Sequence, residues 1–195
     1  MLEPALALIE FSSIATGIQA ADAMAKRAPI DLLRSGTVQP GKYLVLIGGQ
    51  VADVEEALSA GRSVGESCLV DSVFLPQVHP DVVEAIAGIR VPHSADALGI
   101  IETTSVAASI RAADAAIKGA QVKLVEIRLA DGLGGKGIVL FSGRVADVET
   151  AASFGLSVLG KEFHVNQIVI PQLHPEMWEN LAAASPFEAR VVNQL

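Results

Sequence analysis

The sequence contains an internal repeat that spans most of its 195 residues. Residues Leu6–Ala28 align with Leu98–Ala120 at a shift of 92 positions, and 12 of the 23 aligned residues are identical. Two further segments recur later in the chain: Val51–Glu55 as Val145–Glu149, and Pro76–Pro80 as Pro171–Pro175. Short repeats stack into solenoids, whereas a repeat of this length builds two similar globular units. We therefore expect a tandem duplication of one domain, with the first copy at residues 4–90 and the second at residues 97–184.

Both copies show the same order of hydrophobic patterns. A short apolar strand precedes a helix with apolar residues at three- and four-residue steps, and Ser12 or Ser13 and Thr104 or Ser105 are its candidate N-caps. Two strands, a second helix, a fourth strand and a short helix that begins at a proline follow. The expected strands are Ala5–Glu10, Ile30–Ser35, Tyr43–Ile47 and Cys68–Leu75, then Leu98–Glu102, Val122–Leu129, Ile138–Phe141 and Val165–Ile170. This β-α-β-β-α-β order predicts an α+β protein of two tandem ferredoxin-like domains, joined by residues 88–97.

Composition limits the classes of function. The net charge of −8 and the lack of a basic cluster argue against broad nucleic-acid binding. No stretch free of charge reaches the roughly 18 residues that a membrane span needs, and the first residues lack the basic start of a signal peptide. The single cysteine, Cys68, excludes an internal disulfide, so we expect a cytosolic protein. Apolar residues make up 51%, more than two small domains can bury alone, which favours an oligomer.

Several short motifs occur in a fixed order: Leu98-Gly99-Ile100-Ile101-Glu102, Ala112–Lys118, Gly134-Gly135-Lys136, and Ile170-Pro171 followed by His174. In this order, and present twice, they resemble the bacterial microcompartment (BMC) shell domain in its unpermuted form. The resemblance implies a homotrimer whose six domains form a pseudo-hexameric tile. Such tiles pack edge to edge with other BMC shell proteins around enzymes, which places the protein in the microcompartment shell. The resemblance also implies a central pore for small metabolites, and no catalytic activity.

In the family, the loops between the second and third strands converge on the central axis, and here these loops are Ser35–Lys42 and Leu129–Lys136. The pore-lining residues implied are Thr37, Val38, Gln39, Pro40, Gly41, Asp131, Gly132, Leu133 and Gly134. Two interpretations are open for each loop. Gln39 either rings an uncharged aperture or is solvated beside a type II-like turn at Pro40-Gly41, and Asp131 either rings the axis or caps a turn away from it.

Relatives of the propanediol-utilisation type hold an iron–sulfur cluster with a cysteine just before the Pro-Gly-Lys of the first loop. This chain has Gln39 at that position. Thiolate is the usual cluster ligand, and an amide does not replace it, so we expect no cofactor.

The resemblance further implies residues at the edges between tiles. Lys26 and Lys118 occupy the edge-lysine position of the family, and the adjoining edge motifs contain Gln77, His79, Gln172 and His174. Gln77 and Gln172 occupy a position at which the edge motifs of the family commonly have an arginine. The alternative for the lysines is a solvated position near a helix C-terminus, which the helix dipole favours. The histidines precede prolines at helix starts, which favours a structural role, and we expect no metal site.

No set of residues suggests catalysis. Glu10 and Glu102 end apolar strands, where a capping or interface hydrogen bond is the expected role. The leading hypothesis is therefore a structural shell tile. Two alternatives are a redox or cofactor conduit within a shell, which needs a redox centre, and a regulatory protein that binds a small molecule in a cleft between its domains.

Overall fold

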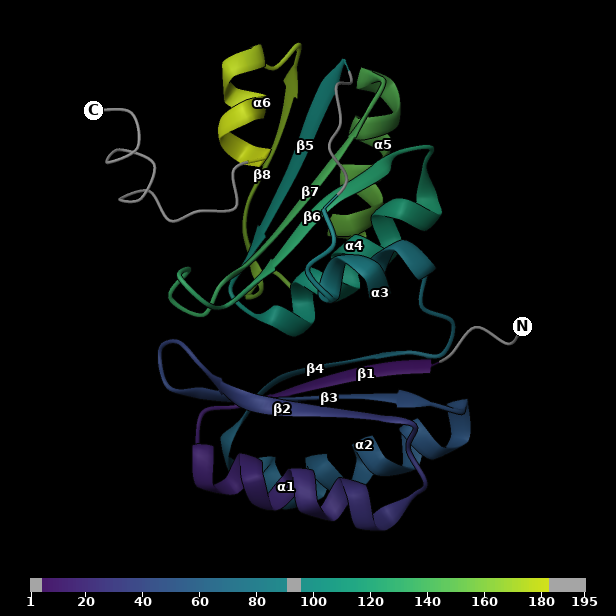
Figure 1. Ribbon diagram of the computed structural model, residues 1–195, viewed down its shortest axis with the longest axis vertical. Coiled ribbons are helices and arrows are strands. Elements are labelled where there is room, and N and C mark those ends of the chain that lie inside the picture. The colour runs from purple at the N-terminus through teal and green to yellow at the C-terminus, as the bar shows by residue number, and fades with distance from the viewer. Residues whose placement is uncertain (1–4, 91–95, 183–195) are drawn as a thin grey trace.

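The computed structural model of the protein describes residues 5–90 and 96–182. The elements of the first repeat are β1 (Ala5–Phe11), α1 (Ile14–Arg27), β2 (Leu32–Val38), β3 (Lys42–Gly49), α2 (Val51–Gly65), the short 3₁₀ helix η1 (Glu66–Cys68), β4 (Leu69–Leu75) and α3 (Pro80–Ile86). Those of the second repeat are β5 (Ala97–Thr103), α4 (Val106–Gly119), β6 (Lys123–Leu129), β7 (Gly137–Gly143), α5 (Val145–Ser157), β8 (His164–Pro171) and α6 (Pro175–Ala182). The same order of strands and longer helices therefore occurs twice (Figure 1).

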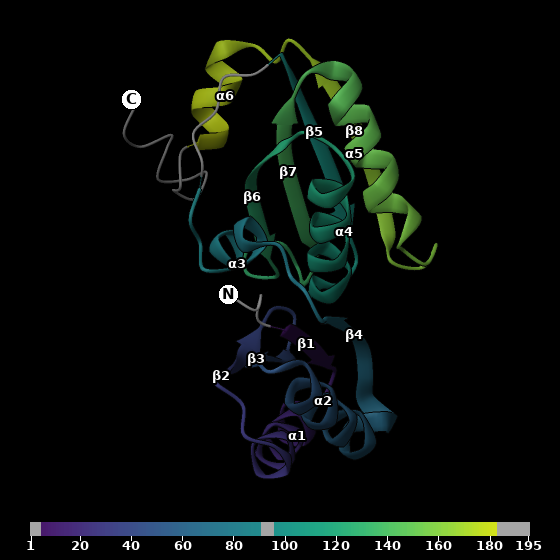
Figure 2. The ribbon, with the colours of Figure 1, turned by 90° about the vertical axis from the view of Figure 1, so that its right-hand side faces the viewer.

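Each repeat contains one antiparallel sheet of four strands. The strand order is β2-β3-β1-β4 in the first sheet and β6-β7-β5-β8 in the second. Helices α1 and α2 cover one face of the first sheet, and α4 and α5 cover one face of the second (Figure 2). This arrangement confirms the predicted α+β class with two ferredoxin-like domains.

The central strand β1 is buried on both faces. Ile9 and Phe11 point toward α1 and α2 and belong to the core of the first repeat. Leu6 and Leu8 point the other way and belong to a core built mainly from the second repeat. Because successive side chains of a strand lie on opposite faces, the first sheet has its own helices on one side and the second repeat on the other.

Serine residues cap the first helix of each repeat. The Ser13 hydroxyl accepts a hydrogen bond from the Thr16 amide at 3.3 Å, and the Ser105 hydroxyl accepts one from the Ala108 amide at 3.1 Å. Of the alternatives considered for each cap, the structure therefore selects Ser13 and Ser105.

Most strand boundaries differ by one to three residues from the sequence-based expectation. Pairing of β2 with β3 continues as far as Val38 opposite Lys42, so the expected Ser35–Lys42 loop shrinks to residues 39–41. The hairpin extends because each added pair satisfies more backbone groups. Strand β2 begins at Leu32, and Cys68 ends η1 instead of starting β4. Residues 4, 183 and 184 of the expected domain bounds, and 91–95 of the connection, lie outside the described residues.

Helix α3 belongs to the first repeat in sequence and to the second in space. It packs against β6 and α4, and Val82 and Ala85 of α3 lie in the core of the second repeat. Helix α4 in turn lies between its own sheet and strands β4 and β1 of the first repeat. In Figure 1, α3 and α4 accordingly lie between the two sheets, whereas α1 and α2 lie at the far end of the molecule.

Candidate functional site

The contact between the two repeats buries one face of α4 that the matching helix α1 exposes. Val106 and Ile110 of α4 are both 0% exposed. At the same positions of α1, Ile14 is 40% exposed and Ile18 is 53% exposed. The repeat therefore presents the same apolar helix face twice, once covered by the first repeat and once open.

The opposite side of this contact shows the same asymmetry. Val73 of β4 and Val82 of α3 are 2% and 0% exposed, because they pack against the second repeat. Their counterparts in β8 and α6, Ile168 and Met177, are 47% and 48% exposed. We name the face of Ile14 and Ile18 the open helix face, and the face of Ile168 and Met177 the open sheet face. Each chain thus carries one open copy of both halves of an interface that it also forms internally.

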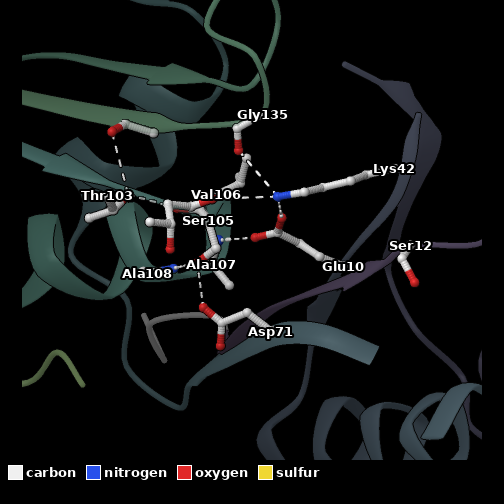
Figure 3. Close-up of polar contacts among 12 residues, drawn as sticks. Glu10, Ser12, Lys42, Asp71, Thr103, Ser105, Val106, Ala107, Ala108 and Gly135 are labelled. Atoms are coloured by element: carbon white, nitrogen blue, oxygen red, sulfur yellow. Dashed lines mark hydrogen bonds and ion pairs between the residues drawn. The ribbon is translucent and has the colours of Figure 1, made fainter. Parts of the chain in front are cut away.

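A buried carboxylate lies at the centre of the contact between the repeats. Glu10, at the end of β1, is 0% exposed, and its Oε1 accepts a hydrogen bond from the Ala107 amide at 2.6 Å. Its Oε2 lies 3.3 Å from the Lys42 ammonium, which also donates to the Gly135 carbonyl at 3.3 Å (Figure 3). Ala107 lies in the first turn of α4, where the helix dipole favours a negative charge. The expectation of an interface hydrogen bond is therefore confirmed for Glu10.

Burial governs the protonation of Glu10. Removal from water penalises the charged form and raises the pKa of Glu10 above its ordinary value, although the Ala107 amide and the Lys42 ammonium oppose this shift. The matching pair in the second repeat, Glu102 and Lys136, is 2.7 Å apart, with side chains 27% and 50% exposed. The same ion pair is thus buried at the internal contact and open at the free end of the second repeat.

A second polar cluster, which the sequence analysis missed, lies beside the first. Asp71 of β4 accepts a hydrogen bond from the Ser105 hydroxyl at 2.5 Å and one from the Arg111 guanidinium at 3.2 Å. Arg111 also donates to the Ser72 carbonyl at 2.8 Å. The signal that identifies this cluster in the sequence is a difference between aligned positions of the two copies, since Gln19 occupies the place of Arg111.

The structure brings three of the six predicted edge residues together. The Lys118 ammonium donates to the Gln77 carbonyl, and both the amide of His79 and Lys118 bond to Asp114. Nδ1 of His79 also accepts from the Asp81 amide at 3.2 Å and so caps α3, which confirms a structural role for this histidine.

The other three predicted edge residues lie at the corresponding open positions. Lys26 pairs with Asp22 one turn earlier in α1, at 2.6 Å. Gln172 and His174 lie exposed between β8 and α6. The internal contact thus holds one set of these residues, and the same set stays open on the surface.

The predicted pore residues occupy the tips of the β2–β3 and β6–β7 hairpins. Thr37 and Val38 lie in β2, and Gln39, Pro40 and Gly41 form the turn, in which the Gly41 amide donates to the Val38 carbonyl at 2.9 Å. The bond between Gln39 and Pro40 is cis, and Pro40 is the third residue of the turn. The interpretation as a type II-like turn is therefore wrong, because this geometry is that of a type VI turn.

The two hairpin tips touch each other. The second tip contains Asp131, Gly132 and Gly134, which are exposed, and Leu133, which is half-buried. A Cβ on Gly135, which has a φ of +86°, would lie 2.7 Å from Cδ of Pro40. Only glycine permits this approach of the two loops.

The hairpin tips contain no thiol that could hold an iron–sulfur cluster. Cys68, the single cysteine of the sequence, is half-buried at the end of η1, where its thiol faces the Gly65 carbonyl at 3.5 Å. Within residues 5–90 and 96–182, no group of three or more His, Cys, Asp or Glu residues could hold a metal ion. Among the described helices, none is long and apolar enough to cross a membrane.

Comparison with known proteins identifies the repeated unit. The sequence matches the BMC domain family twice, at residues 5–78 and 97–173. It is 41% identical to the bacterial microcompartment shell protein PduT of Citrobacter freundii over 92% of this chain and 98% of that protein. It is 35% identical to the shell protein PduA of the same organism over 42% of this chain and 90% of PduA.

Among solved structures, a microcompartment protein from Desulfitobacterium hafniense DCB is 44% identical to this chain. It aligns with a TM-score of 0.78 and covers 90% of this chain and 98% of its own. The chain therefore belongs to the BMC domain family of microcompartment shell proteins, as a member that carries the domain twice.

Proposed function

We propose that this protein is a structural tile of a bacterial microcompartment shell. Three chains associate head to tail, so that six domains form a pseudo-hexameric ring, and small metabolites pass through its centre. The tile joins other BMC shell proteins at its edges, where Lys26, Lys118, Gln77, His79, Gln172 and His174 are the candidate contacts. The protein acts by assembly and by limiting passage, without catalysis.

One observation carries this proposal: the two halves of the internal contact recur, uncovered, on the chain surface. The open helix face exposes Ile14 and Ile18, and the open sheet face exposes Ile168 and Met177. Because the buried counterparts of these faces fit each other within the chain, the open sheet face of one copy fits the open helix face of the next. Contacts of this kind are heterologous, and they give a ring when the rotation closes. The family resemblance supports closure at three chains.

The touching hairpin tips support the pore. Gly135 lies against Pro40, so both loops of one chain gather in one place. In a closed ring, three such pairs surround the axis. Gln39 then contributes an uncharged hydrogen-bonding group, and Asp131 contributes a carboxylate that disfavours anions.

The molar mass in solution tests the assembly. Light scattering behind a sizing column should give three times the chain mass of 20.2 kDa. An aspartate in place of Ile18 should shift the protein to smaller species, because a charge cannot be buried unpaired in an apolar contact. Its helical content, measured by far-UV circular dichroism, should stay unchanged.

The control variant is Val158→Asp. Val158 is 41% exposed and its counterpart Val64 is 36% exposed, so the internal contact covers neither position. This variant should keep the mass of the wild type. A wild-type protein that stays monomeric at every concentration would overturn the proposal.

A further inference from the structure

The internal contact between the repeats contains an ion pair whose matching positions on the two open faces are uncharged. At the internal contact, Asp71 accepts from the Ser105 hydroxyl and from Arg111. The Asp71 side chain is 6% exposed and the Arg111 side chain 24% exposed, so this ion pair is largely removed from water. Each partner depends on the other, because a buried charge without a counter-charge is strongly unfavourable.

The positions that match this pair carry neutral amides. Asp71 pairs with Glu10 across the first sheet, and Asn166 pairs with Glu102 in the same register of the second, so Asn166 takes the place of Asp71. Both residues also accept a hydrogen bond from the next amide, at 2.7 Å for Asp71 and 2.9 Å for Asn166.

On the helix side, the repeat shift of 92 places Gln19 at the position of Arg111. The same shift places Ser13 at the position of Ser105, and both serines cap their helices. The helix cap is thus the same in the two copies, whereas the open sheet face and the open helix face both have a neutral amide in place of a charged group.

We propose that Asn166 of one chain meets Gln19 and Ser13 of a second copy of this chain. This contact is neutral, whereas the matching contact within the chain contains the charged pair Asp71–Arg111. The difference sorts the repeats, so that first and second copies alternate around the ring. The inference rests on the proposed head-to-tail assembly and identifies the residues that make it selective.

Four pairings of the two sheet faces with the two helix faces are conceivable, and two of them leave a charge unpaired. The first sheet against α1 would bury Asp71 opposite Gln19, with no cation. The open sheet face against α4 would bury Arg111 opposite Asn166, with no anion. The internal contact pairs both charges, and the chain-to-chain contact contains neither. Specificity here comes from penalties on the wrong pairs.

Two single substitutions recreate the two disfavoured pairings at the chain-to-chain contact. Asn166→Asp sets a carboxylate against Gln19, and Gln19→Arg sets a guanidinium against Asn166. Each should raise the protein concentration at which the trimer half-dissociates by about tenfold or more, as measured by analytical ultracentrifugation. The double variant recreates the pair seen at the internal contact and should recover most of the loss.

The outcomes separate this inference from the proposed assembly. Recovery in the double variant supports the pairing of Asn166 with Gln19. A trimeric wild type whose two substitutions have additive or no effects overturns the pairing but leaves the trimer intact. A wild type that is not a trimer overturns the assembly itself. Because both positions are exposed in the single chain, far-UV circular dichroism should show that all variants fold.

Discussion

One cross-strand pair in the core divides its side-chain volume differently in the two repeats. In the second repeat, Gly99 of β5 lies opposite Phe141 of β7, and in the first repeat Ala7 lies opposite Ile47. Ala7, Ile47 and Phe141 are all fully buried. A Cβ added to Gly99 would lie 2.2, 2.6 and 2.8 Å from three ring atoms of Phe141, where ordinary contact begins at 3.4 Å. The small residue thus makes room for the large one.

We expect Gly99→Ala to lower the free energy of unfolding by about 1–3 kcal/mol, which is the usual cost of overpacking a core. Phe141→Ile alone should cost about 1–3 kcal/mol, because it leaves a cavity beside the glycine. The double variant reproduces the alanine–isoleucine pair of the first repeat. Its cost should fall short of the sum of the single costs by about 1–3 kcal/mol.

Urea unfolding followed by far-UV circular dichroism, at one protein concentration for all variants, measures these values. The control is Gly36→Ala, since a Cβ at Gly36 meets nothing within 4 Å, and this variant should lose no stability. Strictly additive costs of Gly99→Ala and Phe141→Ile would refute the reasoning, because the contact would then carry no coupling.

Three further predictions concern the contacts of the assembly. Because burial raises the pKa of Glu10, this residue binds its proton more tightly in the native state than in the unfolded state. Its stabilising contribution is therefore present below the unfolded pKa of 4.5 and is lost as pH rises through the folded pKa. The stability of the wild type relative to Glu10→Gln, from urea titrations at several pH values, should therefore fall as pH rises above 4.5, and parallel curves would contradict this. In a Cys68→Ser background, Gln39→Cys should form disulfides between chains on oxidation, visible on a non-reducing gel, if the hairpin tips surround the axis; Glu149→Cys, exposed on α5, should not. Lys26→Ala should leave the trimer mass unchanged but reduce the formation of extended sheets seen by electron microscopy, and equal sheet formation would argue against an edge role.

Much of the fold could be read from the sequence because the repeat reports each element twice. Serine caps and the proline start of α3 are local signals, and both were confirmed at Ser13, Ser105 and Pro80. The length of the first hairpin was misjudged, since glycine and proline mark a turn but do not show how far the strand pairing extends before it.

The partner of α3 could not be predicted, because an apolar helix face does not specify which of two similar sheets it covers. The same limit hid the role of Asp71, whose partners are 34 and 40 residues away in the sequence. Such contacts between repeats emerge only when the two copies are placed in space. The pore and edge residues remain predictions, since they depend on neighbours that a single chain does not contain.

The crossing of α3 from the first repeat to the second has a consequence for the order of assembly. The covalent connection keeps the two repeats at a high effective concentration, so their mutual contact forms within each chain at any dilution. Only the chain-to-chain contact then depends on diffusional encounter. A ring of six domains made in this way needs two encounters between chains, because its last contact closes within the assembly, whereas six separate domains would need five. Duplication therefore lowers the kinetic order of ring formation, and scarce protein can still complete its tiles.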